Sequence, residues 1–191
     1  AAFSALFGTP LAAAIFSMEV VSVGIMHYSA LVPCVIASLT AHGIASACGI
    51  APEIFPIASI PAFTPKNALI IGIFAVLCAL VSILFCTTLH NAERLYKRFF
   101  KNPYVRALAG GLIVIGLTML AGNQTYNGTG MNIITGCMEG KTVFPLAFLL
   151  KMIFTAATLG AGYKGGEIVP TLFIGSTFGT FFASAFGCSI P

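Results

Sequence analysis

The chain has 191 residues, of which 58% are hydrophobic and only 7% are charged. Roughly a quarter of the residues in a soluble domain are charged, so this composition excludes a soluble fold and indicates an integral membrane protein. The net charge of +4 does not indicate a nucleic-acid partner, because five of the nine basic residues lie in one stretch between two apolar segments, residues 93–106. The positive-inside rule predicts that this basic loop faces the cytoplasm.

Several segments reach the roughly 20 apolar residues that a spanning helix needs, and none alternates like a membrane β-strand. We therefore expect an all-α integral membrane fold, a bundle of tilted and broken helices. Pro33 is expected to interrupt the third helix, and residues 131–138 are too few to span and suggest a re-entrant half-helix. The helices are expected at about residues 1–6, 11–24, 29–50, 66–98, 105–121, 131–138, 143–159 and 168–186.

Two connections differ from the helices in composition. Residues 51–65 contain four prolines and are expected to be extended, whereas residues 122–130 are polar and rich in glycine and are expected to form a loop opposite the basic stretch. The first residue is not methionine and no leader precedes the apolar residues, so we interpret the chain as an interior fragment.

The six cysteines lie apart from one another, without a CxxC pair or a nearby pair of histidines. This pattern favours reduced thiols buried as small hydrophobic groups. We expect no metal and no cofactor.

Three ionisable residues lie in or beside apolar segments, where a charge is costly and usually functional. Glu19 is either a carboxylate at the membrane boundary or in a buried ion pair, or a group that handles ions. Lys151 either caps carbonyls or pairs with a carboxylate for structural reasons, or lies on an ion pathway. Glu167 lies between two glycines and a long hydrophobic segment.

The stretch that contains Glu167 suits an anion. Its glycines let the backbone turn sharply, and a helix that begins there directs unpaired N–H groups and the positive end of its dipole outward. The candidate anion-binding residues are Gly165, Gly166, Glu167, Ile168, Val169 and Pro170.

Broken helices with a glycine-rich helix start at membrane depth are typical of transporters. Residues 159–175, LGAGYKGGEIVPTLFIG, resemble the GSGxxGGxFxP signature of the CLC chloride channels and proton-coupled anion transporters. Residues 7–19, FGTPLAAAIFSME, resemble the FNAPLAG segment of that family, and Lys151 stands where the family often has a basic residue.

This resemblance implies a partial CLC-type transport domain over residues 1–191, roughly its middle to second half. It implies a homodimer in a bacterial plasma or inner membrane, with one anion pathway per subunit and, in antiporters, coupled protons. The backbone amides of Glu167 and Ile168 would line the central site for chloride or fluoride. Other elements of the pathway lie outside these residues, so the chain alone is not expected to conduct.

The chain departs from the family pattern at two places. Paired acidic residues often follow the FNAPLAG segment, but here the pair is Glu19-Val20, which puts the usual proton route in doubt. Glu167 stands where most members have an apolar residue, as in some members that resemble fluoride/proton antiporters. We therefore hypothesise that Glu167 couples anion and proton movement, with Glu19 as the second candidate for proton coupling or gating.

Two other classes of function are alternatives to anion transport. An intramembrane protease would need two aspartates or a serine–histidine pair, and the chain has no aspartate and no histidine at suggestive spacing from a nucleophile. We therefore do not expect an enzyme. A non-conducting structural or assembly protein remains the alternative to an anion transporter.

Overall fold

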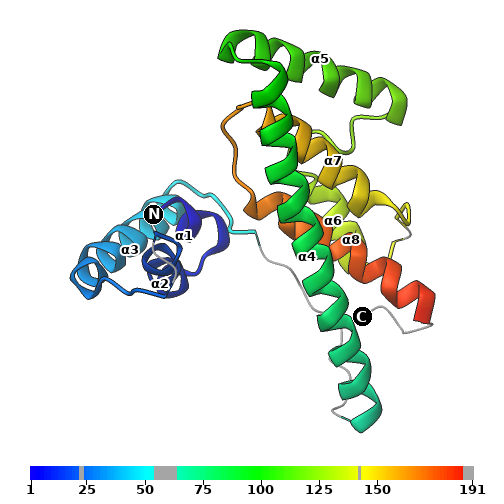
Figure 1. Ribbon diagram of the computed structural model, residues 1–191. Coiled ribbons are helices and arrows are strands. Elements are labelled where there is room, and N and C mark those ends of the chain that lie inside the picture. The colour runs from blue at the N-terminus through cyan, green and yellow to red at the C-terminus, as the bar shows by residue number, and fades with distance from the viewer. Residues whose placement is uncertain (22–23, 54–63, 142, 187–191) are drawn as a thin grey trace. The chain divides into compact units, whose positions relative to one another are not determined.

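The computed structural model describes residues 1–21, 24–53, 64–141 and 143–186. Regular secondary structure within these ranges is entirely helical, which confirms the predicted all-α class (Figure 1). The chain divides into two compact units, Ala1–Pro56 and Ile57–Pro191. The predicted proline-rich connection falls largely at residues 54–63, outside the described ranges.

The first unit holds α1 (Ala2–Phe7), α2 (Pro10–Val21), the short 3-10 helix η1 (Tyr28–Ala30) and α3 (Leu31–Ala47). Gly8 ends α1 with a φ of 67°, in the left-handed region that glycine adopts without strain. The buried hydroxyl of Ser4 donates to the carbonyl of Ser38 at 2.7 Å and ties α1 to α3. Small side chains at this contact let the helices approach closely.

The prediction that Pro33 interrupts the third helix is wrong. Pro33 is the third residue of α3, which continues without a break to Ala47. A proline in the first turn removes an N–H that has no partner within the helix, so it does not disturb the turns that follow.

The second unit contains α4 (Pro65–Phe99), α5 (Pro103–Ala121), α6 (Met131–Met138), α7 (Ala147–Gly160) and α8 (Ile168–Phe186). A buried cluster joins α4, α7 and α8 through Phe85, Phe148, Met152, Ile174 and Phe178. Nine of the 14 residues of α7 are buried, so this short helix is the centre of the unit.

α4 contains the helix predicted at residues 66–98, so the basic stretch at residues 93–106, also predicted as a loop, is a loop only at residues 100–102. α4 has 35 residues and about 50 Å of length at roughly 1.5 Å per residue, more than a hydrocarbon core of about 30 Å. Its last turns carry an exposed ion pair, Lys97 Nζ to Glu93 Oε1 at 2.6 Å. The side chain of Asn102 then caps α5 by accepting from the Tyr104 N–H at 2.9 Å, so only residues 100–102 connect the helices.

Four of the described helical segments are long and apolar enough to cross a membrane: Tyr28–Ala47, Pro65–Phe99, Pro103–Ala121 and Ile168–Phe186. α2 and α7 are shorter apolar helices. The predicted half-helix at residues 131–138 is α6, with the same bounds. α7 begins at Ala147 and not at residue 143. Pro145 explains the later start, because the residue before a proline avoids the helical region.

The chain leaving α7 is fixed to the first half of α5. Arg106 Nε donates to the carbonyl of Ala161 at 3.2 Å, and the Tyr163 hydroxyl donates to the carbonyl of Ala107 at 2.9 Å. Gly110 of α5 is buried at this contact, and a Cβ at this position would overlap the side chain of Ala161. The two backbones can approach this closely only because residue 110 has no side chain.

We predict that Gly110→Ala destabilises the intact polypeptide that contains this chain by about 1–3 kcal/mol, because the added methyl group overpacks the contact with Ala161. Gly116→Ala is the matched control in the same helix, since a Cβ at Gly116 meets nothing within 4 Å. Thermal unfolding in detergent measures both. Equal midpoints for the two variants would contradict the tight contact.

Candidate functional site

The glycine-rich motif connects α7 to α8. After α7 the backbone turns through Gly162, whose φ is 97°, and runs without regular structure to Glu167. The carbonyl of Glu167 accepts from the Thr171 N–H at 3.0 Å, so α8 starts directly after Glu167. The first N–H groups of a helix have no partner within it, and they carry the positive end of the helix dipole. The sequence placed a helix start here, and the structure has one.

The six predicted anion-binding residues form one continuous segment but differ in position. Gly165, Gly166 and Glu167 are exposed and precede the helix. Ile168, Val169 and Pro170 form its first turn, and the side chain of Ile168 is 40% exposed. Of the six, Gly165, Gly166 and Pro170 line a cavity.

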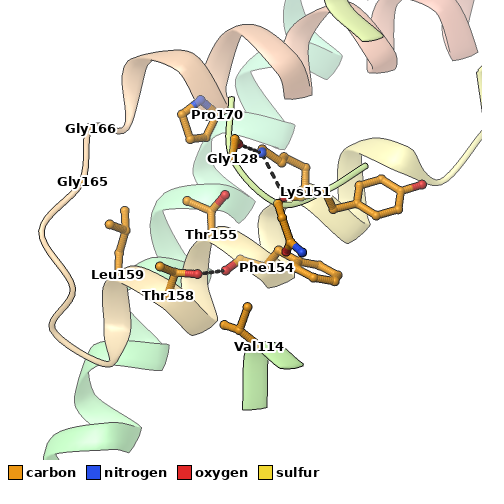
Figure 2. A pocket seen from close by; sticks show the side chains of 12 residues that line it. Val114, Gly128, Lys151, Phe154, Thr155, Thr158, Leu159, Gly165, Gly166 and Pro170 are labelled. Atoms are coloured by element: carbon orange, nitrogen blue, oxygen red, sulfur yellow. Dashed lines mark hydrogen bonds between the residues drawn. The ribbon is translucent and has the colours of Figure 1, made fainter. Parts of the chain in front are cut away.

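This cavity has a volume of about 390 Å³ and lies between α7, the motif, one residue of α5 and the polar loop that follows α5 (Figure 2). α7 contributes a stripe at helical spacing, because residues three and four apart share a face. The lining residues are Val114, Tyr126, Asn127, Gly128, Lys151, Phe154, Thr155, Thr158, Leu159, Gly165, Gly166 and Pro170.

Lys151 is the one charged side chain among these lining residues, and it is 2% exposed. Its ammonium donates to the carbonyl of Tyr126 at 3.1 Å and to that of Gly128 at 2.6 Å (Figure 2). Its Nζ also lies 5.1 Å from the ring centroid of Phe173, within the range of a cation–π contact. No carboxylate in the described part of the chain forms an ion pair with it.

Of the two interpretations of Lys151, the contacts in the structure are those of a carbonyl cap. The carbonyls belong to the loop at residues 122–130, 23 and 25 positions earlier in the chain. Lys151 also borders the cavity, so the role in an ion pathway stays a prediction.

The polar loop is packed firmly against the helices. Gly130 has a φ of 70°, and a Cβ there would lie 2.6 Å from the ring of Phe173, so both the backbone and the space require glycine. Tyr126 is buried with its ring 5.7 Å from that of Phe154. Asn127 Nδ2 donates to Thr118 Oγ1 at 3.1 Å, which ties the loop to α5.

Glu19 belongs to the first compact unit, Ala1–Pro56. It is exposed near the C-terminal end of α2. In the described ranges no group of three histidine, cysteine, aspartate or glutamate side chains is placed to hold a metal ion.

Sequence reasoning missed two components of the cavity. One is the pair of loop carbonyls that hold Lys151, which no sequence pattern marks. The other is Thr155, four residues after Lys151, on the same face of the helix predicted at residues 143–159. That spacing was visible in the sequence and was the available signal.

Comparisons with known proteins show the family of the chain. A family model described as voltage gated chloride channel matches residues 1–191. A chloride/fluoride channel protein of Pseudomonas syringae pv. tomato is 33% identical over 185 residues, which is 94% of this chain and 41% of that protein. The voltage-gated ClC-type chloride channel ClcB of Salmonella typhimurium is 26% identical, covering 100% of this chain and 46% of its own.

A solved structure is also similar. The crystal structure of a CLC-type fluoride/proton antiporter matches with a TM-score of 0.88 and 30% identity, over 98% of this chain and 48% of that one. The chain therefore spans about half the length of the relatives it matches. With four helices able to cross a membrane and a family match over its whole length, the chain is part of a multi-pass membrane protein and belongs to the voltage-gated chloride channel family, the CLC family.

Proposed function

We propose that the intact polypeptide containing this chain transports small inorganic anions across a membrane, as a CLC-type channel or anion/proton antiporter. One observation carries this proposal. The start of α8 and the buried ammonium of Lys151 border one cavity whose lining includes no carboxylate side chain. Such a cavity favours an anion, because the one charged side chain among its lining residues is a cation.

The segment from Gly165 to Pro170 is the proposed backbone site for the anion, with the amides of Glu167 and Ile168 at its centre. Two facts support it. α8 begins at Ile168, so the N–H groups at this end are unused by the helix. In addition, neither Gly165 nor Gly166 donates its N–H to an acceptor within the described ranges.

Fluoride is the anion that the comparisons favour alongside chloride. The relative from Pseudomonas syringae is named a chloride/fluoride channel protein, and the similar crystal structure is that of a fluoride/proton antiporter. The sequence feature that agrees is Glu167, a protonatable group beside the proposed backbone site. A carboxylate there would repel an anion when ionised and admit it when protonated, which would link the two movements.

We also propose the domain organisation, oligomeric state and membrane orientation of the whole protein. Both compact units belong to one transport domain, which is completed by polypeptide outside this chain. The protein is a homodimer in the inner membrane of a bacterium, and the basic stretch at residues 93–106 faces the cytoplasm. Five basic side chains at one end of two spans support that orientation.

We predict that liposomes containing the intact polypeptide release fluoride or chloride at least tenfold faster than empty liposomes. Ion-selective electrodes record the release, with valinomycin present so that potassium balances the charge. Release of neither anion would favour the alternative, a structural or assembly protein. The ratio of the two rates gives the selectivity.

We predict that Glu167→Gln reduces proton uptake driven by an anion gradient at least tenfold, because the amide cannot carry the proton. A pH-sensitive dye inside the liposomes measures it. Glu93→Gln is the control, since this exposed glutamate pairs with Lys97 at the far end of α4. Unchanged coupling in Glu167→Gln would refute its role, and Glu19→Gln in the same assay tests the second candidate.

A further inference from the structure

The hydroxyl of Thr155 differs from the other helical threonines around it. Thr158, one turn further along α7, donates to the carbonyl of Phe154 at 2.8 Å, and Thr118 on α5 bonds back to its own helix in the same way. Thr155 makes no hydrogen bond within the described ranges although it is only 7% exposed. Figure 2 shows the contrast, with a bond drawn from Thr158 and none from Thr155.

The unpaired hydroxyl faces the cavity. In the described part of the chain no fully buried side-chain oxygen or nitrogen lacks a hydrogen-bond partner. Because the Thr155 oxygen has no partner, it must border open space, and the open space that this buried residue lines is the cavity. Figure 2 shows its oxygen turned toward Gly128 and Pro170 and away from Thr158.

Lys151 lines the same cavity. An ammonium has three N–H donors, and two of them are bonded to the carbonyls of Tyr126 and Gly128. Lys151 and Thr155 are four residues apart, so they lie on one face of α7. Each of the two loop carbonyls accepts a hydrogen bond from Lys151, and the Thr155 hydroxyl keeps an O–H donor that no protein acceptor in the described ranges uses.

We propose that this cavity is a binding site for a small, partly hydrated inorganic anion, with the Thr155 hydroxyl and the Lys151 ammonium as its side-chain ligands. This inference rests on the proposed function and deepens it, because it adds side-chain ligands in a cavity that three residues of the proposed backbone segment, Gly165, Gly166 and Pro170, also line. At about 390 Å³ the cavity exceeds a bare halide ion and has room for several waters, so the anion keeps part of its hydration.

The two threonines provide a matched test. Thr155→Val and Thr158→Val remove the same hydroxyl from the same helix and the same cavity, but only Thr155 has a hydroxyl free for a ligand. Calorimetric titration of the purified intact polypeptide with sodium fluoride and with sodium chloride measures binding. We expect Thr155→Val to weaken binding about tenfold, the size of one hydrogen bond to a charged partner.

Two further variants separate the hydroxyl from packing. Thr155→Ser retains the donor and should bind within about twofold of the native protein, as should Thr158→Val. Thr155→Ala removes the donor without valine's branching and should repeat the loss. Equal thermal unfolding midpoints check that each variant is folded.

The outcomes distinguish this inference from the proposed function. Native binding and transport with unchanged affinity in both Thr155→Val and Thr155→Ala would overturn the side-chain site and leave the transport function standing. Equal weakening by Thr155→Val and Thr158→Val would also overturn it, because packing would then explain both. Absence of anion binding and of anion release in the native protein would refute the proposed function together with the site.

Discussion

The site in the second unit depends on the bonds between the Lys151 ammonium and the two carbonyls of the polar loop. Burying a charge costs several kcal/mol unless strong hydrogen bonds compensate, and charge-assisted bonds are roughly twice as strong as neutral ones. Tyr126 and Gly128 supply two such bonds, and the ring of Phe173 lies over the same ammonium. One side chain of α7 thereby joins the loop after α5 to α8. If the loop moved away, the buried ammonium and both carbonyls would lose their hydrogen-bond partners. These bonds therefore hold the loop where it closes one side of the cavity.

Close contacts of glycine place the helices that carry these groups. Gly110 lies against Ala161, and Gly160 at the end of α7 lies against Ala92 of α4, where a Cβ would come within 3.0 Å of that alanine's side chain. Helices in lipid gain little from hydrophobic burial against one another and depend on such close packing. α7 is consequently buried on most sides, and its exit into the motif is fixed at Ala161 and Tyr163 by α5. The glycines of the motif therefore lie between two fixed ends, Tyr163 and the first turn of α8.

The helical fold and the position of the motif could be predicted because they depend on local properties, the length of apolar segments and the placement of glycine and proline. The predictions failed where a local rule depends on the position of a residue relative to the start or end of a helix. Pro33 would break a helix interior but is harmless in a first turn, and the composition does not tell where α3 begins. The basic stretch was predicted both as the end of the helix at residues 66–98 and as a loop, and in the structure the helix continues to Phe99. The partners of Lys151 lie 23 and 25 residues away, and the side-chain direction of Thr155 depends on packing, so neither could be derived from the sequence.

The position of Glu167 relative to this cavity bears on how an anion and a proton could be linked. Two N–H groups of the Lys151 ammonium donate to neutral carbonyls, and Glu167 is exposed and is not among the residues that line the cavity. A carboxylate paired with Lys151 would cancel the positive charge of the cavity. Neutral partners keep the charge, and no ion pair joins Lys151 to Glu167 in the described ranges. The cation that lines the cavity and the carboxylate at the start of α8 are therefore separate groups, so replacing Glu167 would remove a carboxylate without breaking a bond of Lys151.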